Sequence, residues 1–445
     1  MSAGGLPSFG EALRVWLRVG LLSFGGPAAQ IAMLHRAVVD EHRWVSDRRF
    51  LHALNFCTLL PGPEAQQLAT YLGWLMHGVR GGLAAGVLFV LPGALVMLAL
   101  SAVYATLGAV PAIAALFFGL KAAVLVLVVE ALLRVARRAL RGAVAWAMAA
   151  LAFLALYTLG VPFPLVVLAA AVVGFLVPDA VVAGRHGVAG DGGPATALDA
   201  ALAADPGRPA RMAPAARRAG WIAVALWLVP VAALAAGSAG VYADVAWFFS
   251  KMAVVTFGGA YAVLAYVAQE AVEGYGWLTA SEMLAGLGLA ETTPGPLILV
   301  LQFVGFLAGF RDGGLMGGVA AAVVTLWVTF APCFAFIFLG APAVERLHGS
   351  RQLGGALAAV TAAVVGVIAN LALWFGLRVL FADIREVRAG PLAIDVPVPA
   401  SLDPAAAAIA VLAAICLFRL RFGVVRTLGV ATVAGLGLHL AAGRI

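Results

Sequence analysis

The sequence predicts an all-α polytopic integral membrane protein made of two homologous halves, arranged as an inverted repeat with broken, re-entrant helices. Its composition, the spacing of its apolar segments and an internal duplication support this fold class. Of 445 residues, 64% are hydrophobic and 11% are charged, and the mean hydropathy is +1.04. A chain of this composition lies mostly in lipid rather than around a soluble core.

The apolar segments give the order of the expected helices. Residues 183–218, rich in Gly, Ala, Pro and Asp, have the composition of a flexible linker. The predicted domains are an N-terminal membrane repeat over 1–182, a cytoplasmic linker over 183–218 and a C-terminal membrane repeat over 219–445. A spanning helix needs about 20 apolar residues. Apolar segments fall at about 11–33, 51–78, 83–107, 111–133, 142–158, 161–182, 219–237, 242–269, 281–309, 314–340, 353–380, 403–418 and 424–441.

The two halves repeat one pattern of motifs at a constant offset of 233 residues (256 minus 23). After a slip of one residue, further glycines match as well. Agreement of this kind at one spacing indicates an internal duplication. The matched pairs are "SFGG" at 23–26 with "TFGG" at 256–259, Trp44 with Trp277, the Pro-Gly-Pro at 61–63 with that at 294–296 and, after the slip, Gly73 with Gly305 and "GGL" at 81–83 with "GGL" at 313–315.

Arginine placement predicts where the chain turns back. Loops 34–50 and 134–141 each hold four arginines, so the positive-inside rule places both in the cytoplasm. Three apolar segments lie between these loops, and three full crossings would put the loops on opposite sides. One segment must therefore enter and leave by the same face. The segment with Pro-Gly-Pro at its centre is the candidate, because proline lacks an amide donor and disfavours helix in the residue before it.

The second half is predicted to enter the membrane from the opposite face. The linker holds five arginines and is cytoplasmic, whereas loops 238–243 and 270–276 have no basic residue and are expected outside. The "TFGG" segment between them then re-enters from outside, and the hairpins of both halves meet near the midplane. The alternative is that every segment spans and one Arg-rich loop breaks the rule. The loop 378–396, with three arginines on the expected outside, also departs from it.

The broken backbone predicts a binding site. Irregular backbone at membrane depth is tolerated only where protein buries it or where it lines a wet cavity. The residues after each Pro-Gly-Pro can begin a half-helix whose free amides and positive dipole end attract anions. The "GG" pairs at 25–26 and 258–259 let an oxyanion approach the backbone closely. The alternative is that these glycines only let helices pack.

Two cations align beside the breaks. Arg18 matches Lys251 at the shared offset, and each lies seven residues before the first glycine of its "FGG". Cations inside apolar segments are costly and usually functional, so we read both as buried and expect the pair to bind a dianion. Lys251 and Lys121 are the only lysines of the chain, and both lie in apolar segments. The alternative for Arg18 is that its guanidinium snorkels to the membrane interface.

Other polar side chains near the breaks are candidates for proton coupling and oxyanion binding. Glu64 directly follows the first Pro-Gly-Pro and Glu291 lies three residues before the second, so either can carry a proton. The alternative for both is that they cap backbone or pair with a cation. Gln66, Thr292 and Thr293 can donate hydrogen bonds to an oxyanion.

Several function classes are disfavoured by absence. The chain has no GxxxxGK[ST] of an ATPase and no HExxH of a metalloprotease. Cys57, Cys333 and Cys416 stand singly in apolar segments, so no cofactor and no metal site is predicted. The net charge of +7 comes from arginines at segment ends, which is weak evidence for a nucleic-acid partner. Transport driven by an ion gradient or by the substrate's own gradient remains.

Four stretches carry a resemblance to a known family: "SFGGPAAQIAMLHRAVVDEHRWVS", "LLPGPEAQQLATYLGWLMHG", "TFGGAYAVLAYV" and "TTPGPLILVLQFVGF". With them, both halves resemble the chromate ion transporter family of prokaryotic inner membranes. The resemblance implies two homologous halves in opposite orientation, export of chromate on the membrane potential or proton gradient, and sulfate as a close analogue. It also implies a role in substrate binding for Phe24, Gly25, Gly26, Pro61, Gly62 and Pro63 and for their partners Phe257, Gly258, Gly259, Pro294, Gly295 and Pro296.

The expected function is therefore that of a secondary transporter in a bacterial inner membrane, not an enzyme. Its expected partners are the lipid bilayer and chromate or sulfate, without nucleic acid, and whether it forms a homodimer stays open. Two alternatives are uptake of sulfate or another oxyanion by the same fold, and a membrane-embedded enzyme acting on lipid phosphates. The enzyme would need a nucleophile or metal cluster at the hairpins, and the paired cations come without one.

Overall fold

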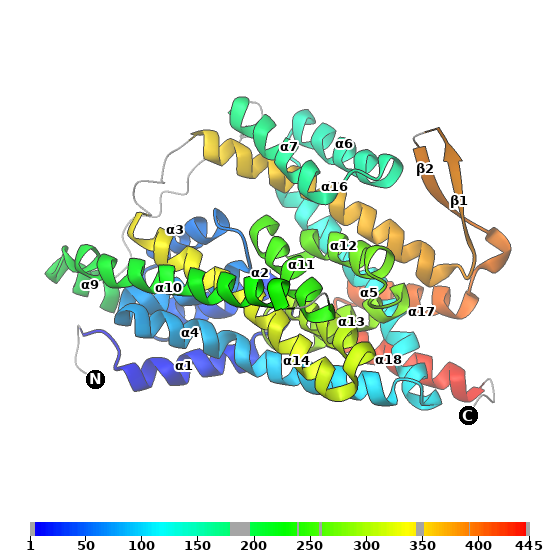
Figure 1. Cartoon of the computed structure of the whole chain (residues 1–445), viewed down its shortest axis with the longest axis horizontal. Coiled ribbons are helices and arrows are strands. Elements are labelled where there is room, and N and C mark those ends of the chain that lie inside the picture. The colour runs from blue at the N-terminus through cyan, green and yellow to red at the C-terminus, as the bar shows by residue number, and fades with distance from the viewer. Residues whose placement is uncertain are drawn as a thin grey trace. The chain divides into compact units, whose positions relative to one another are not determined.

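The computed structural model of the chain is almost wholly helical (Figure 1). It describes residues 5–178, 196–237, 240–257, 260–343, 351–390 and 392–441. The all-α membrane class is confirmed, because six of the described helices are long and apolar enough to cross a membrane. They are Glu64–Leu107, Pro111–Ala139, Arg208–Gly237, Leu297–Gly340, Arg351–Leu380 and Val424–Ala441.

The chain forms two compact units, and each takes segments from both sequence repeats. The first unit consists of the described parts of Met1–Leu98, His186–Ala260 and Thr293–Gly349. The second consists of the described parts of Ala99–Arg185, Tyr261–Thr292 and Ser350–Ile445. The repeats are therefore interleaved in space. The repeat boundaries at 182 and 219 concern the sequence and stay a prediction.

The first unit holds the helices that flank both sets of motifs. Serine hydroxyls start two of them: Ser8 Oγ accepts from Glu11 N at 3.2 Å, and Ser46 Oγ accepts from Arg49 N at 3.4 Å. These bonds satisfy amides that a helix start leaves unpaired. In chain order the elements are α1 (Phe9–Leu22), α2 (Gly26–His35), η1 (Arg36–Glu41), α3 (Asp47–Thr58), α4 (Glu64–Leu107) up to Leu98, α9 (Ala197–Ala204), α10 (Arg208–Gly237), α11 (Val241–Val255), η3 (Leu297–Leu299), α14 (Val300–Gly340) and η4 (Ala341–Ala343).

The first Pro-Gly-Pro, residues 61–63, is the tip of a re-entrant hairpin, and we call it the first tip. Its arms are the 12 residues of α3 and residues 64–76 of α4. At 1.5 Å per residue each arm is about 20 Å long, short of the hydrocarbon core of about 30 Å. The arms run side by side, since the ring centroids of Phe56 and Tyr71 are 5.2 Å apart. The hairpin predicted at this segment is confirmed.

A second reversal follows each hairpin, with the same backbone angles in both copies. His77 and Gly78 interrupt α4 with φ of −132° and +66°, and Gly313 and Gly314 interrupt α14 with φ of −136° and +61°. The positive φ of Gly78 and Gly314 is accessible to glycine at little cost. The duplication predicted from the motifs is therefore visible in the backbone, around a second tip at residues 294–296.

The register of the second copy differs from the prediction after the second tip. A Cβ on Gly73 would lie 2.4 Å from the Gly81 carbonyl oxygen, and one on Gly309 would lie 2.3 Å from that of Gly317. These equivalent contacts are 236 residues apart (309 minus 73), so the predicted match of Gly73 with Gly305 is wrong. The three additional residues form η3, a 3₁₀ turn that the first copy lacks because α4 starts directly at Glu64. The glycine identities at the other spacing are coincidences in a Gly-rich chain.

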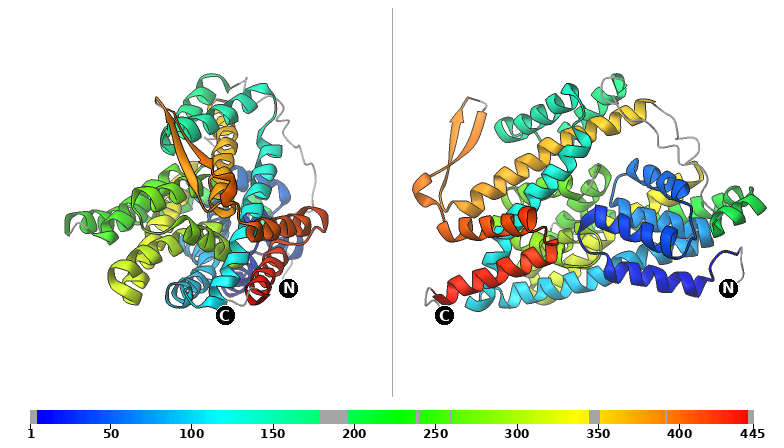
Figure 2. Two further views of the ribbon diagram at one scale, coloured as in Figure 1. Left: turned by 90° about the vertical axis from the view of Figure 1, so that its right-hand side faces the viewer. Right: turned by 180° about the vertical axis from the view of Figure 1, so that it is seen from behind.

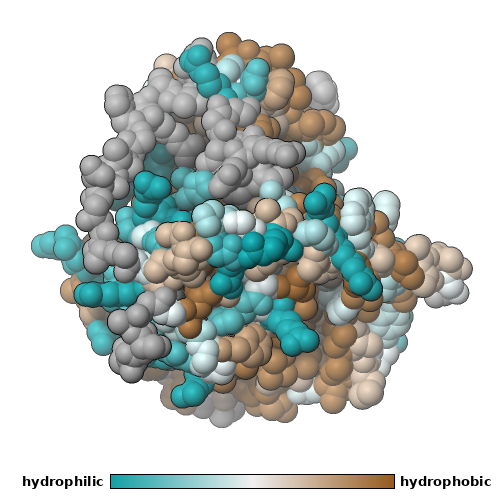
Figure 3. Space-filling view, turned by 90° about the vertical axis from the view of Figure 1, so that its left-hand side faces the viewer, coloured by the Kyte–Doolittle hydropathy of each residue, from teal (hydrophilic) through white to brown (hydrophobic). Residues whose placement is uncertain are grey.

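The described part of the expected linker 183–218 is largely helical, while residues 183–195 lie outside the described residues. The segment "ALDAALAA" forms α9 because it is rich in strong helix formers and starts at the N-cap Thr196. Leu198 is fully buried, and its amide donates to the Trp44 carbonyl at 2.9 Å. Arg49 Nε donates to Asp199 Oδ1 at 2.7 Å. Hydrophilic side chains gather on the end of the unit that carries α9 (Figure 3).

The second unit is built around α5 and α16. Helices α6 and α7 lie along α16, and α18 lies along α5 (Figure 1 and Figure 2). Small residues permit this close approach, as where Gly174 meets Gly355. The elements are the rest of α4, α5 (Pro111–Ala139), α6 (Ala143–Leu159), α7 (Phe163–Leu176), α12 (Ala260–Gln269), η2 (Glu270–Gly274), α13 (Ala280–Thr292), α16 (Arg351–Leu380), the antiparallel strands β1 (Ile384–Ala389) and β2 (Leu392–Pro397), η5 (Pro399–Ser401), α17 (Pro404–Ala414), η6 (Ile415–Arg419) and α18 (Val424–Ala441).

Removing the Arg49 guanidinium should release α9. Partial burial raises the pKa of Asp199, but hydrogen bonds from Thr196, Arg49 and Ser46 and the charge of Arg49 outweigh it and lower the pKa. The docking energy is therefore present at neutral pH and is lost as the pH falls below about 4. Arg49→Ala should lower the free energy that docks α9 by about 1 kcal/mol. We therefore expect backbone amides of α9 to exchange hydrogen about fivefold faster. The exposed neighbour Arg48→Ala is the control, and equal exchange in both variants contradicts the docking role.

Candidate functional site

Each tip forms a backbone hydrogen bond with the opposite copy. Gly62 N donates to the Thr256 carbonyl at 2.8 Å, and Gly295 N donates to the Ser23 carbonyl at 2.8 Å. Both donors and both acceptors are related by the offset of 233. We call this pair of hydrogen bonds the tip crossing. It joins the Pro-Gly-Pro of one copy to the residue before "FGG" of the other, so each break receives a partner that its own copy does not supply.

Glycine is favoured at both tips by backbone conformation, and at the first tip also by space. Gly62 has φ of +119° and Gly295 has φ of +88°, and such angles are rare for residues with a Cβ. A Cβ on Gly62 would lie 2.9 Å from Cys333 Sγ in α14, and one on Gly93 in α4 would lie 2.0 Å from the Pro294 carbonyl oxygen. Each tip thus packs on the long helix of the other copy.

A small cavity of about 20 Å³ lies at the tip crossing. Its volume is about that of one water molecule. Its lining partly repeats the internal symmetry, since Pro27 and Ala260, and Pro63 and Pro296, are pairs at the offset of 233. The other lining residues are Gln30, Glu64 and Ala65 of the first copy, and Leu297 and Ile298 of η3, the turn that the first copy lacks.

The lining residues lie in the first turns of four helical segments. Helix α2 begins at Gly26, α4 at Glu64, α12 at Ala260 and the continuous run of η3 and α14 at Leu297. The first amides of a helix have no partner within it, and its N-terminal end carries a partial positive charge. Four such ends around one cavity gather positive partial charge there, and the predicted anion binding at these half-helices stays a prediction.

The polar side chains of the cavity come from one copy only. Gln30 is buried, and its Nε2 donates to the Gly295 carbonyl of the second tip. Glu64 is the first residue of α4. Their second-copy equivalents are the apolar Val263 and, at the structural offset of 236, Val300. Sequence analysis missed Gln30, although it stands one turn after the first "FGG" and a comparison with Val263 would have marked the difference.

Further buried polar atoms surround the tips. Among the described residues, four buried side-chain oxygens of the first unit near the motifs have no hydrogen-bond partner in the protein: Ser23 Oγ, Gln66 Oε1, Gln67 Oε1 and Gln302 Oε1. Gln66 and Gln302 are equivalent at the structural offset of 236, and their amide groups donate to Thr70 Oγ1 at 3.1 Å and to the Ala94 carbonyl at 3.0 Å. Buried oxygens of this kind are normally satisfied, so this region can accept hydrogen bonds from water or from a protonated group.

The two predicted cations do not line the cavity. The Arg18 side chain is 61% exposed and its Nη1 lies 3.2 Å from Glu41 Oε2. Lys251 is exposed, with Nζ 5.9 Å from the ring centroids of Trp247 and Phe248. The expectation that both are buried is wrong. Helix α1 buries the stripe Ala12, Val15, Trp16 and Val19, and Arg18 lies outside that stripe.

The other predicted residues are distributed over both units. The turns before the two "FGG" motifs match, with Phe24 N donating to Leu22 O at 3.0 Å and Phe257 N to Val255 O at 3.1 Å. Gly25 and Gly26 have φ of +90° and +77°. Gly258 and Gly259 lie outside the described residues. Thr293 is buried in the first unit.

Glu291 and Thr292 belong to the second unit. Glu291 is buried and its Oε1 accepts from the Tyr261 hydroxyl, while the Thr292 hydroxyl donates to the Leu289 carbonyl at 2.9 Å. Both side chains thus have partners within their own unit. Their predicted roles in proton coupling and oxyanion binding stay predictions.

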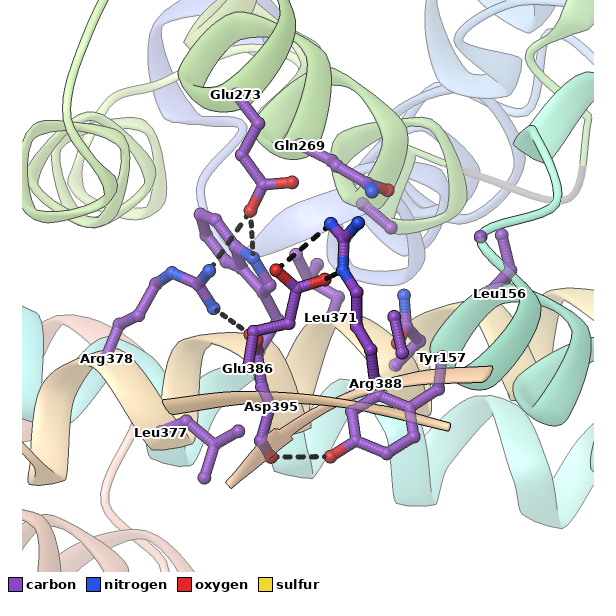
Figure 4. Close-up of a pocket in the computed structure, with 15 residues that line it drawn as sticks. Leu156, Tyr157, Gln269, Glu273, Leu371, Leu377, Arg378, Glu386, Arg388 and Asp395 are labelled. Atoms are coloured by element: carbon purple, nitrogen blue, oxygen red, sulfur yellow. Dashed lines mark hydrogen bonds and ion pairs between the residues drawn. The ribbon is translucent and has the colours of Figure 1, made fainter. Parts of the chain in front are cut away.

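A larger pocket of about 400 Å³ lies in the second unit, and its charges neutralise one another (Figure 4). Arg378 bridges Glu273 and Asp395, each at 3.1 Å, and Arg388 Nε lies 2.7 Å from Glu386. Three carboxylates and two guanidinium groups leave a net negative lining, which disfavours a dianion. Two arginines of the loop that departs from the positive-inside rule, Arg378 and Arg388, take part in these ion pairs.

The interleaved repeats, the paired helix breaks and the apolar spans define a polytopic membrane transporter. The chain belongs to the chromate transporter family, whose model matches residues 10–175 and 243–437. The resemblance noted from the motifs is confirmed, and the two matched regions correspond to the two halves.

Three relatives illustrate the match. The chain is 37% identical to the chromate transport protein of Pseudomonas aeruginosa over 81% of this chain and 79% of the relative. It is 28% identical to that of Cupriavidus metallidurans, over 80% of each, and 27% identical to a probable chromate transport protein of Synechococcus elongatus, over 82% and 84%. No solved structure matches the chain. The protein is therefore a chromate transporter and not an enzyme.

Gly93→Ala should weaken the packing of the second tip on α4. The added Cβ would lie 2.0 Å from the Pro294 carbonyl oxygen, and relieving such an overlap costs about 1–3 kcal/mol. We expect a fall of a few degrees in the thermal unfolding midpoint of the detergent-purified protein. The control is Gly10→Ala in α1, where a Cβ meets nothing within 4 Å. Equal midpoints for the two variants would show that the tip does not pack there.

Proposed function

We propose that the chain exports chromate from the cytoplasm across a bacterial inner membrane, driven by the membrane potential or the proton gradient. The observation that carries this proposal is the convergence of four helix N-termini on the cavity at the tip crossing. Chromate is a tetrahedral dianion, and helix N-termini supply both amide donors and positive partial charge for its oxygens. A membrane potential that is negative inside drives a dianion outward by about 4.6 kcal/mol per 100 mV.

The closed cavity implies that the tips separate during transport. A volume of about 20 Å³ holds one water and not a tetrahedral oxyanion. In the tip crossing one backbone hydrogen bond holds each tip to the other copy, and a bond of this kind contributes about 1 kcal/mol. The Gln30 side chain adds a hydrogen bond at the second tip, so separation of the second tip also breaks this bond. In an inverted repeat the two tips open toward opposite faces of the membrane.

Glu64 is the proposed coupling group. It lines the cavity at the first position of α4, so its ionised carboxylate competes with the dianion for the same positive helix ends. Protonation removes that competition and lets the anion bind. Proton binding and anion binding are thereby favoured together at one residue, so a proton leaves with the dianion and the membrane potential, not the proton gradient, drives export through this group. Gln30 holds the second tip across the same cavity and positions its backbone.

Arg18 and Lys251 are proposed to attract the dianion rather than to coordinate it. Each lies on the helix that precedes its "FGG", and both side chains are exposed. Exposed cations raise the local concentration of an anion, and salt screens this effect within about 10 Å at 0.1 M. Their contribution is therefore to the rate of encounter.

Chromate uptake into inverted vesicles tests the direction of transport and the role of Glu64. Vesicles energised with a respiratory substrate should accumulate chromate, and excess sulfate should reduce the accumulation if the site reads tetrahedral shape and charge. Glu64→Gln should flatten the dependence of the rate on pH, because the neutral amide removes the competing charge at every pH. Glu11→Gln, at an exposed glutamate in the first turn of α1, is the control. Accumulation only in right-side-out vesicles, with chromate or with sulfate, would identify an uptake permease.

Lys251→Ala should act through encounter alone. At low ionic strength we expect KM to rise about threefold with kcat unchanged, and at 0.5 M salt the difference from the wild type should disappear. Initial rates in the same vesicles at two salt concentrations measure this. A loss of kcat at every salt concentration would instead place Lys251 in the binding site.

A further inference from the structure

A basic groove in the second unit is not used by the transport site. It has a volume of about 540 Å³ and lies between the C-terminal end of α5 and the connection from η6 to α18. Its lining joins arginines to large apolar side chains. The lining residues are Glu130, Leu133, Arg134, Arg137, Arg138, Leu417, Phe418, Arg421, Phe422, Gly423 and Val424.

The groove carries a net positive charge. Arg134 pairs with Glu130 through two hydrogen bonds, which neutralises one guanidinium. Among the residues that the structure describes, no carboxylate forms an ion pair with Arg137, Arg138 or Arg421. Arg137 and Arg138 also complement the negative C-terminal end of α5. That role does not account for Arg421, which comes from a different helix connection.

The backbone of Arg421 is held in an unfavourable conformation. Its φ of +54° lies in the left-handed region, which residues other than glycine, asparagine and aspartate rarely adopt. The Phe422 amide donates to the Cys416 carbonyl at 2.9 Å across this turn. Strain of this kind persists where the surrounding structure fixes it, and it often marks functional sites. Here it accompanies a third unpaired guanidinium on the groove.

The apolar part of the lining specifies an amphiphile. Leu133 is 41% exposed and Phe418 is 48% exposed, and both lie beside the arginines on the groove. A free oxyanion needs no such surface, whereas a phospholipid presents a phosphate and acyl chains together. The loop 134–141 is cytoplasmic by the positive-inside rule, and the nearby Arg419 and Arg421 fit the same side. Basic pockets between helices on that side of a membrane hold anionic headgroups.

We propose that this groove binds an anionic phospholipid. Its phosphate lies among Arg137, Arg138 and Arg421, and its acyl chains lie against Leu133 and Phe418. The lipid bridges α5, which belongs to the first sequence repeat, to the C-terminal helices of the second. It therefore fastens the second unit at the cytoplasmic interface.

The test measures the affinity of the full-length chain in mixed micelles for phosphatidylglycerol, with phosphatidylcholine and inorganic phosphate as the comparison ligands. Binding is measured by native mass spectrometry and by shifts in the thermal unfolding midpoint, recorded without tryptophan fluorescence. Wild-type protein should bind phosphatidylglycerol in preference to phosphatidylcholine. Arg137→Gln combined with Arg421→Gly should weaken that binding at least tenfold, at about fivefold per arginine. Glycine relieves the φ of +54°, so this variant removes charge without adding strain.

Arg217→Gln combined with Arg218→Gln is the matched control, since it removes two exposed charges from α10. The control should keep wild-type affinity. Equal weakening in both double variants would show a nonspecific charge effect and overturn the proposal. If inorganic phosphate binds as tightly as the lipid, the groove is a site for a free oxyanion. If phosphatidylcholine binds as tightly as phosphatidylglycerol, the arginines do not select an anionic headgroup. Either result overturns the proposal.

Discussion

The tip crossing is the constraint on which the rest of the first unit depends. A helix break at membrane depth leaves backbone amides and carbonyls without partners, and lipid cannot hydrogen-bond them. Gly62 and Gly295 each donate to a carbonyl of the opposite copy, so one break satisfies the other. A single copy has the break but not the acceptor. Duplication supplies the missing half, which explains why the compact units take segments from both repeats instead of following the repeat boundary.

The symmetry of the backbone is combined with an asymmetry of side chains. Two pairs of equivalent residues line the cavity, yet the carboxylate of its lining, Glu64, is matched by Val300 in the structural register, and the amide side chain of its lining, Gln30, is matched by Val263. Any proton chemistry among the lining residues therefore resides in the first copy. Under the proposed mechanism, Glu64 is the one titratable group of this lining. A symmetric pair of glutamates facing each other at this distance would instead repel one another and share protons.

The sequence predicts the fold well because the motifs have local physical causes. A proline removes an amide and a glycine permits positive φ, so Pro61, Gly62 and their repeats mark breaks without any knowledge of neighbours. The arginine-rich loops then give the sides of the membrane. The site was only partly predictable. Its tips and Glu64 follow from chain position, but the exposure of Arg18 and Lys251 depends on which helix face the neighbouring helices cover, and that is tertiary information.

Two other differences have the same origin. The insertion of η3 shifts the register of the second copy by three residues. Glycine identity alone cannot distinguish the true register from a coincidence, whereas the contact of Gly309 with Gly317 identifies it. The linker composition indicates flexibility, but a buried Leu198 and the pairing of Arg49 with Asp199 fix α9 on the first repeat. Composition gives only the average tendency of a segment, whereas one buried leucine and one ion pair determine whether this helix docks.

The tip crossing also suggests how substrate binding and conformational change are linked under the proposed mechanism. The amides of Gly62 and Gly295 hold carbonyl oxygens when the cavity is empty. Hydrogen bonds to a charged acceptor are about twice as strong as those to a neutral one, so a dianion at the cavity can take over donors that the carbonyls release. Once the anion leaves, those amides lack a partner, and an unsatisfied buried amide costs about 1–3 kcal/mol. The empty protein is thereby driven back to the crossed state, and the bonds that build the fold also return it to its starting conformation.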